Sequence, residues 1–209
     1  MVAETAAANA GGGLRHFQRP APCIIGICIY LLDTLGSNER TNKMIHEFTG
    51  RYQVRETSKS FGEVTAALED AFGSVENEVF TNEVSQSKDS ADFENRMRRY
   101  EKTSGFMCFH MIDHGAWLAA LGSKSRTKMY TIGNPLIART MIKYDLGVGL
   151  NVPVRVAVHE DPVTKKVRVS YNLPSSLMSA LANNDVCKAA KGLDAKLIAL
   201  AEKVTGVAA

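Results

Sequence analysis

The 209-residue sequence lacks an excess of charge of either sign, because 25 Lys and Arg stand against 22 Asp and Glu. Its basic residues are scattered rather than clustered, so nucleic acid is not an expected partner. Cysteine is also scarce. The four residues Cys23, Cys28, Cys108 and Cys187 include no second Cys or His pair at zinc-finger spacing, and no structural metal is expected. Their apolar surroundings favour free thiols in a reducing cytoplasm.

Long hydrophobic runs are missing as well. The uncharged stretch 23–32 is about half of what crosses a bilayer, so we expect no transmembrane segment. Three alternatives stay open for it: a buried or edge strand or short docking helix, a contact with a membrane surface or partner, or part of a disordered extension. Residues 1–13 lack the basic start of a signal or transit peptide. The sequence predicts a disordered or loosely docked extension over 1–45, one domain over 46–206 and a tail over 207–209.

Several motifs with known chemistry are absent. The sequence contains neither GxGxxG nor GxxxxGK, which disfavours the familiar forms of nucleotide binding. It also lacks GxSxG and HExxH, which removes the commonest hydrolase and zinc-protease interpretations. We therefore expect no cofactor and no metal ion.

Helix signals are present in the first half of the expected domain. Ser60 and Glu63 form a capping box, which satisfies two backbone N–H groups at a helix start. Apolar residues recur at helical spacing over 61–72, and Gly73 is expected to end this helix in the left-handed conformation. A weaker apolar stripe predicts a second, more exposed helix and consists of Phe93, Met97 and Tyr100.

Further along, two polar residues are typical helix N-caps. Asp113 is a candidate cap for a short helix over 116–121. Asn134 precedes Pro135, and this pair is the strongest helix-start signal in the chain. The last helix is expected over 185–204, where apolar residues recur at helical spacing.

Alternating residues predict the strands, which are expected over 51–57, 106–112, 128–132, 154–160 and 166–171. In the first, Tyr52 and Val54 are the expected buried residues. In the second, Cys108 and His110 are expected on one face, opposite Met107, Phe109 and Met111. The last two strands flank a short turn and form an antiparallel hairpin. Strands that interleave with helices and include a hairpin predict an α+β fold, a two-layer sandwich with a mixed, largely antiparallel sheet packed against helices.

Three segments carry a resemblance to a known family, namely Tyr130–Ile137 (YTIGNPLI), Val152–Glu160 (VPVRVAVHE) and Val169–Pro174 (VSYNLP). In order and spacing they resemble the motifs of domain-of-unknown-function family 302, in particular its fungal members, over about residues 46–206. The resemblance implies a compact α+β fold and, in some relatives, dimers. The polar insertion before Gly105 departs from the compact bacterial pattern. The family has no assigned reaction, so the resemblance implies no catalytic role.

Candidate site residues follow from their chemistry. Imidazole and carboxylate groups fall within five residues at His110, Asp113 and His114, which are the candidates for acid–base catalysis. The ligand-binding candidates are Asn134, Arg155, His159 and Tyr171. Structural roles compete with each assignment: a hydrogen-bonded half-core histidine at His110, helix capping at Asp113 and Asn134, and a solvent-facing strand position at His159.

Two functions of different kinds remain. In the first, the polar face of the sheet binds a small polar or acidic metabolite, with acid–base conversion left open. In the second, the domain is a non-catalytic module that forms homodimers. A pocket reached by His110, Asn134 and His159 together would favour the first, and a flat or self-paired face would favour the second.

Overall fold

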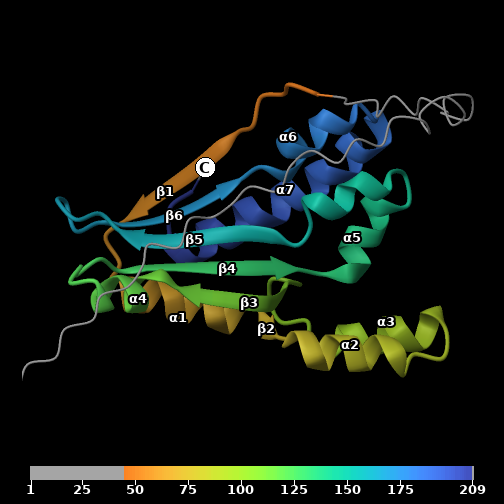
Figure 1. Ribbon diagram of the computed structural model, residues 1–209, viewed down its shortest axis with the longest axis horizontal. Helices are drawn as coiled ribbons and strands as arrows, with labels where there is room; N and C mark the ends of the chain where they lie inside the picture. The colour runs from red at the N-terminus through yellow and green to blue at the C-terminus, as the bar shows by residue number, and fades with distance from the viewer. Residues whose placement is uncertain (1–44, 209) are drawn as a thin grey trace, which may run out of the picture. The chain divides into compact units, whose positions relative to one another are not determined.

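The computed structural model describes residues 45–208, so the predictions for the stretch 23–32 lie outside the described residues. The described chain forms a six-stranded sheet with the order β1-β6-β5-β4-β3-β2 (Figure 1). Every neighbouring pair is antiparallel except the short β2, which runs parallel to β3. This mixed, largely antiparallel sheet packs against helices, which confirms the predicted α+β class.

The elements have the following bounds. The strands are β1 Tyr52–Thr57, β2 Gly73–Ser74, β3 Met107–Asp113, β4 Thr127–Gly133, β5 Val154–Glu160 and β6 Val167–Asn172. The α-helices are α1 Phe61–Ala71, α2 Asn77–Ser85, α3 Ser90–Arg98, α4 His114–Ala120, α5 Pro135–Ile142, α6 Pro174–Met178 and α7 Asn184–Thr205. Two 3-10 helices occur as well, η1 at Leu146–Leu150 and η2 at Ser179–Leu181. None of the helices within 45–208 combines the length and apolar character that a bilayer crossing requires.

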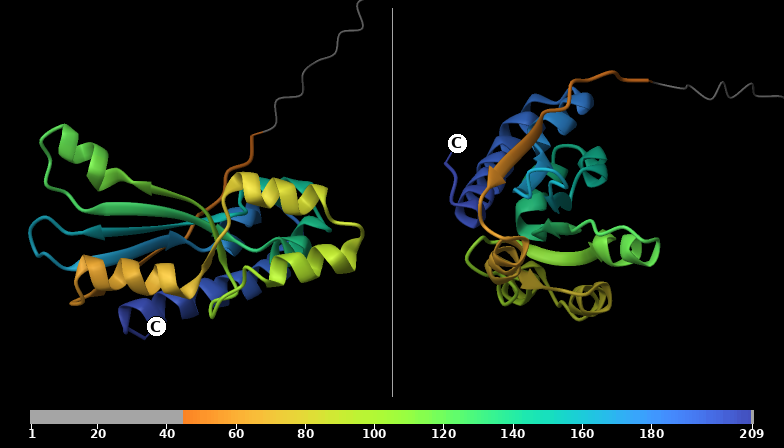
Figure 2. Two further views of the ribbon diagram at one scale, coloured as in Figure 1. Left: turned by 90° about the horizontal axis from the view of Figure 1, so that it is seen from below. Right: turned by 90° about the vertical axis from the view of Figure 1, so that its left-hand side faces the viewer.

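One face of the sheet, called the covered face here, packs against α1 and α7 (Figure 2). The alternation predicted for the hairpin is confirmed, because β5 and β6 bury Val154, Val156, Val158, Val167, Val169 and Tyr171 in the main core. Helix α7 supplies the opposite side of this core with Val186, Ala190, Leu193, Leu197, Leu200 and Val204. Each fully buried aliphatic side chain of this kind contributes about 1.5–3 kcal/mol.

The opposite face, called the open face, carries no helix over its middle in either view of Figure 2. Strand pairing arranges its side chains in three rows across the sheet. The α5-end row consists of His110, Thr131 and Arg155. The middle row consists of Ile112, Met129, Ala157, Ser170 and Val54. The hairpin-end row consists of Thr127, His159, Arg168 and Glu56.

Strand β1 buries the side opposite to the one predicted. Tyr52 and Val54 lie on the open face and are 62% and 44% exposed. The buried side is the more polar one, because Arg55 and Thr57 reach the C-terminal end of α7. Thr57 Oγ1 donates to the carbonyl of Thr205 at 2.8 Å. The tertiary partner, rather than the apolar pattern, therefore decides which side of this edge strand is covered.

A β-bulge in β3 corrects a second prediction. The pairing with β4 shifts between Cys108 and His110, so the strict alternation breaks at Phe109. Cys108 consequently joins the main core, whereas His110 is exposed on the open face. The alternation predicted that Cys108 and His110 share a face, and this prediction is wrong because the bulge places them on opposite faces.

The helix starts are confirmed more fully than the helix ends. Ser60 and Glu63 form the predicted capping box of α1. Gly73, however, does not end α1 in the left-handed conformation; it begins β2. A Cβ at this position would lie 1.9 Å from the backbone oxygen of Tyr100. Gly73 is required there by the close approach of two backbones.

Candidate functional site

A cleft of about 1060 Å³ runs along α5, past the ends of β4 and β5, and is called the α5 cleft here. Most of its lining is apolar, and this part consists of Phe80, Phe109, Ile132, Pro135, Ile137, Ala138, Met141, Ile142, Leu146, Val152, Pro153, Val154 and Leu193. The polar lining consists of His110, Thr131, Asn134, Arg139, Lys143, Tyr144 and Asp145. Cavities that hold small molecules measure about 300–1,000 Å³, so the α5 cleft has the size of a ligand site.

Asn134 fixes the start of α5 and with it one wall of the cleft. Its Oδ1 accepts from the Leu136 N–H at 2.8 Å, which confirms the predicted N-cap. Its Nδ2 donates to Glu101 Oε1 at 2.6 Å and to the Gly105 carbonyl at 2.9 Å. The side chain is 5% exposed and has a partner for each of these groups. Asn134 therefore acts here as a structural anchor between α5 and the 101–105 loop.

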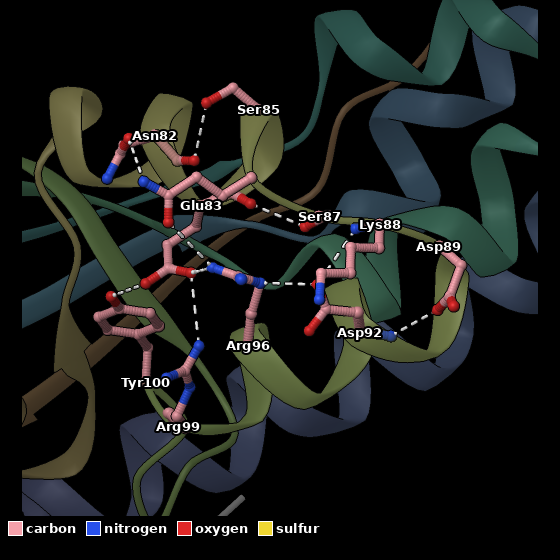
Figure 3. Close-up of polar contacts among 11 residues, drawn as sticks. Asn82, Glu83, Ser85, Ser87, Lys88, Asp89, Asp92, Arg96, Arg99 and Tyr100 are labelled. Atoms are coloured by element: carbon pink, nitrogen blue, oxygen red, sulfur yellow. Dashed lines mark hydrogen bonds and ion pairs between the residues drawn. The ribbon is translucent and has the colours of Figure 1, made fainter.

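The aromatic end of the cleft depends on the hairpin of α2 and α3. In this hairpin, Glu83 accepts hydrogen bonds from Arg96 and from the Tyr100 hydroxyl, both at 2.8 Å, and pairs with Arg99 at 3.4 Å (Figure 3). The hydrogen bonds from Arg96 and Tyr100 hold the pKa of Glu83 below its usual range. This network ties the two helices together and so fixes the helix that carries Phe80.

Phe80 meets Phe109 of β3 in an edge-to-face contact, with ring centroids 5.3 Å apart. Both rings pack against a small core of their own, which also receives Leu136 of α5. Edge-to-face aromatic pairs add about 0.5–1.5 kcal/mol to the burial of their surfaces. The two rings form a fixed apolar wall immediately beside His110.

The α5-end row lies beside the cleft: His110 and Thr131 line it, whereas Arg155 on the next strand is not part of the lining. His110 lies directly across from Thr131 on β4, and Thr131 lies across from Arg155 on β5. Paired residues of neighbouring strands have Cα atoms about 4.5–5.5 Å apart. Within residues 45–208, the side chains of His110 and Arg155 have no hydrogen-bond or ion-pair partner. An imidazole and a guanidinium are thus free to bind a ligand.

Charged groups along α5 are differently occupied. Arg139 donates to Glu94 Oε1 of α3 at 2.7 Å. Asp145 Oδ1 accepts from the Gly147 N–H at 2.8 Å and caps η1. Lys143 Nζ lies 4.6 Å from the centre of the Tyr144 ring, a cation–π contact. Tyr144 follows the end of α5 at Ile142, is exposed and lines the cleft.

Two of the predicted catalytic residues lie outside the cleft. Asp113 Oδ1 accepts from the Ala116 N–H at 2.9 Å, so this carboxylate is the N-cap of α4. His114 Nδ1 accepts from Trp117 Nε1 at 3.0 Å. Of the three predicted acid–base residues, His110 is the one that lines the α5 cleft.

His159 and Tyr171 are also apart from the α5 cleft. His159 lies four residues from Arg155 along β5, about 13 Å at the usual rise of a strand. It neighbours Arg168, and burial together with the Arg168 charge holds its pKa below the usual range. Tyr171 is buried on the covered face. The predicted residues His110, Asn134 and Arg155 come together at one end of the sheet, and His159 and Tyr171 do not join them.

Nucleophilic and metal chemistry have little support in the described part of the chain. Burial raises the pKa of the Cys108 thiol, which opposes formation of the reactive thiolate. No group of three or more His, Cys, Asp or Glu residues within 45–208 is arranged to hold a metal ion.

Comparison with known proteins places the domain. A family model for the domain of unknown function DUF302 matches residues 80–204. The chain belongs to the DUF302 family. A crystal structure of an uncharacterized conserved DUF302 protein from Bacillus stearothermophilus has the same fold, with a TM-score of 0.53 and 14% sequence identity. The similarity covers 73% of this chain and 97% of that chain. No curated protein matches the sequence.

The segment matched to DUF302 contains the whole lining of the α5 cleft, from Phe80 to Leu193. Strand β1 and helix α1 precede it. The cleft is therefore built from the part of the chain that defines the DUF302 domain.

Sequence reasoning missed several cleft residues of this DUF302 domain, notably Phe80, Phe109, Thr131 and Lys143. Thr131 had a usable signal, because it alternates with buried residues in a strand that leads into a well-capped helix. Phe80 had no such signal. Helix α2 was not predicted, and Phe80 reaches the cleft through a tertiary contact with Phe109 of β3.

Proposed function

We propose that this DUF302 domain binds a small acidic metabolite in the α5 cleft. The observation that carries the proposal is the α5-end row, where His110 and Thr131 line a cleft of about 1060 Å³ and Arg155, which lies across from Thr131 but is not part of the lining, has no described partner. Arginine presents a planar fork of donors that matches a carboxylate, and charge-assisted hydrogen bonds are about twice as strong as neutral ones. Thr131 adds a hydroxyl between the two.

His110 supplies the imidazole of this site, and histidine is the side chain that most often acts in general acid–base catalysis. It is exposed and lines the cleft, so a bound acid can reach its imidazole. Asp113 and His114 are engaged in α4 and do not line the cleft. Any acid–base conversion of the ligand therefore falls to His110. Free thiols at Cys108 and Cys187 suit the reducing cytoplasm predicted for the protein.

Retention of a ligand tests the proposal. The full chain is purified from its native host, and bound small molecules are identified by mass spectrometry. We expect an organic acid with the parent protein, and at least a tenfold loss of it in His110→Ala and Arg155→Ala, since a hydrogen bond to a charged group is worth about 1.5–3 kcal/mol. Arg126→Ala serves as control, because Arg126 is an exposed arginine paired with Glu160 at the far end of the sheet. Equal retention in all four proteins rejects the site.

The exposed apolar surface of α4 supports a second function, which is a homodimeric module. This seven-residue helix contains no buried residue. Its large apolar side chain Trp117 is 50% exposed, and Leu121, which follows the helix, is 76% exposed. Isolated helices of this length are unstable in water, and most helical stability comes from packing of an apolar face. We propose that α4 of a second copy covers this surface in a homodimer.

The oligomeric state tests this second function. Sedimentation velocity at high micromolar concentration is expected to give a dimer for the parent and a monomer for Trp117→Ser with Leu121→Ser. Val163→Ser is the control, because Val163 is an exposed apolar residue in the turn between β5 and β6. A monomeric parent protein excludes the dimer.

A further inference from the structure

The walls of the α5 cleft do not match the small polar ligand that the sequence suggested. Beyond the α5-end row, most of the lining is aliphatic and aromatic, with Ile137, Ile142 and Val152 along its length and Phe80 and Phe109 beside His110. A ligand no larger than its acidic group would leave water against these apolar surfaces, and burying apolar surface is worth about 25 cal/mol per Å². The cleft therefore fits a ligand with a substantial apolar body.

The length of α5 sets the length of that body. The helix has eight residues, which at about 1.5 Å per residue gives about 12 Å. The cleft follows α5 from Asn134 at its N-terminus to Tyr144 beyond its C-terminus. With carbon–carbon bonds of about 1.5 Å, an extended chain of about eight to ten carbons covers this distance.

The charges of the cleft indicate which end takes the acid. At the far end, Lys143 Nζ lies over the Tyr144 ring at 4.6 Å from its centre, and the carbonyl groups at the C-terminus of α5 disfavour an anion. Arg139 is occupied by Glu94. At the near end, His110 and Arg155 have no described carboxylate partner. An anionic group is therefore stabilised at the α5-end row, with the apolar body extending along the helix.

We infer that the ligand is an elongated amphipathic acid, a carboxylic acid with an aliphatic or aromatic body of about eight to ten carbons. This inference rests on the proposed function, since it names the class of ligand for the same cleft. Specificity for length then comes from the residues along α5. Ala138 has the smallest side chain among them, and it leaves space in the cleft that the apolar body of the ligand would fill.

A chain-length series tests the inference directly. The full chain is titrated calorimetrically at pH 7 with the sodium salts of straight-chain carboxylic acids from two to twelve carbons, below their micellar concentrations. Each added methylene is expected to raise the affinity about fourfold, because burying one is worth about 0.8 kcal/mol. The increase is expected to stop near ten carbons. Primary alcohols of the same lengths are expected to bind at least tenfold more weakly.

A cavity-filling variant locates the apolar body. Ala138→Leu adds three carbons to the cleft and is expected to shorten the longest acid that binds well, while acids of four carbons keep their affinity. Thr140→Leu is the matched control, because Thr140 lies on the same helix, is exposed and does not line the cleft. The same shift in both variants would overturn the placement along α5.

The outcomes separate the inference from the proposed function. If no acid of any length binds, the proposed function fails, and the inference fails with it. If acids of two to four carbons bind as tightly as longer ones, the acid site stands and the amphipathic class is wrong. If alcohols bind as tightly as acids, the α5-end row does not recognise an acidic group.

Discussion

The two ends of the open face contain the same types of residue in different bonding states. Each end has a histidine and an arginine in one row across the sheet. Near α5, His110 of β3 and Arg155 of β5 are separated by β4, whereas near the hairpin turn His159 of β5 and Arg168 of β6 lie on neighbouring strands. Arg168 pairs with Glu56 at 2.9 Å and with Asp161 at 2.7 Å. Arg155 has no partner within the described chain. Residue type alone therefore does not distinguish a structural arginine from a candidate ligand-binding arginine.

The difference follows from what the neighbouring elements supply. At the hairpin end, β1 places Glu56 opposite Arg168, and the turn adds Asp161. The hydrogen bond from Lys166, followed by that from Arg168, holds the pKa of Glu56 below its usual range. At the α5 end, the corresponding β1–β6 pair is Tyr52 with Asn172, which offers no carboxylate. The carboxylate missing from this end is the group that the proposed ligand would supply.

The largest expected effect is on stability, and it tests whether the open face is exposed to solvent or covered by a partner. Leu197 of α7 is buried in the main core between this helix and the covered face, and Leu197→Ala should lower the free energy of unfolding by about 2–5 kcal/mol. Met129→Ala, in the middle row of the open face, should cost less, because Met129 is only partly buried. Urea unfolding of both variants measures this. Equal losses would mean that a partner covers the open face and would favour the dimer.

The next effect concerns the anchor of the α5 end. Asn134→Ala removes the N-cap of α5, which is worth about 0.5–2 kcal/mol, and also removes the hydrogen bonds to the Gly105 carbonyl and to Glu101 Oε1. The melting temperature is expected to fall more for this variant than for Asp113→Ala, which removes a cap that makes one hydrogen bond. A variant that melts with the parent protein contradicts the role of Asn134 as an anchor.

Much of the fold could be predicted because local signals and tertiary packing agree in the second half of the chain. The cap at Asn134, the hairpin of β5 and β6, and the apolar stripe of α7 all depend on spacing that a single sequence displays. The buried side of β1 could not be predicted in the same way. Polar Thr57 faces the core because it donates to the carbonyl of Thr205, which lies far from it in the sequence.

The candidate site divides along the same line. His110, Arg155 and Asn134 could be proposed from residue type and strand alternation. Their assembly depends on β4 lying between β3 and β5, and strand order leaves no trace in the spacing of residues. The bulge at Phe109, which separates Cys108 from His110, was likewise unpredictable, since it arises from pairing with β4. Sequence thus predicted the groups but not which of them meet.

A smaller effect sharpens the comparison between the two arginines. Arg168→Ala removes two ion pairs and is expected to lower the melting temperature slightly, because surface pairs contribute little individually. Arg155→Ala removes none and is expected to melt with the parent protein. Binding of a ten-carbon carboxylate should change in the opposite order, with a loss for Arg155→Ala only. A lower melting temperature in Arg155→Ala would show that Arg155 has a structural partner.

The smallest effect is a pH dependence at the hairpin end. Backbone hydrogen bonds from Thr164 and Val163, with the Arg168 charge, lower the pKa of Asp161 to about 2 from its ordinary 3.8. Between these two values the unfolded chain binds a proton that the folded chain does not, so the contribution of Asp161 is complete above about pH 4 and is lost towards pH 2. Urea unfolding at pH 5 and pH 2.5 should therefore show a smaller loss of stability on acidification for Asp161→Asn than for the parent. Some loss remains in the variant, because the pKa values of Glu56 and Glu83 are lowered too. An unchanged loss would mean that Asp161 is not bonded in the folded protein, and the paired state of the hairpin end would then be wrong.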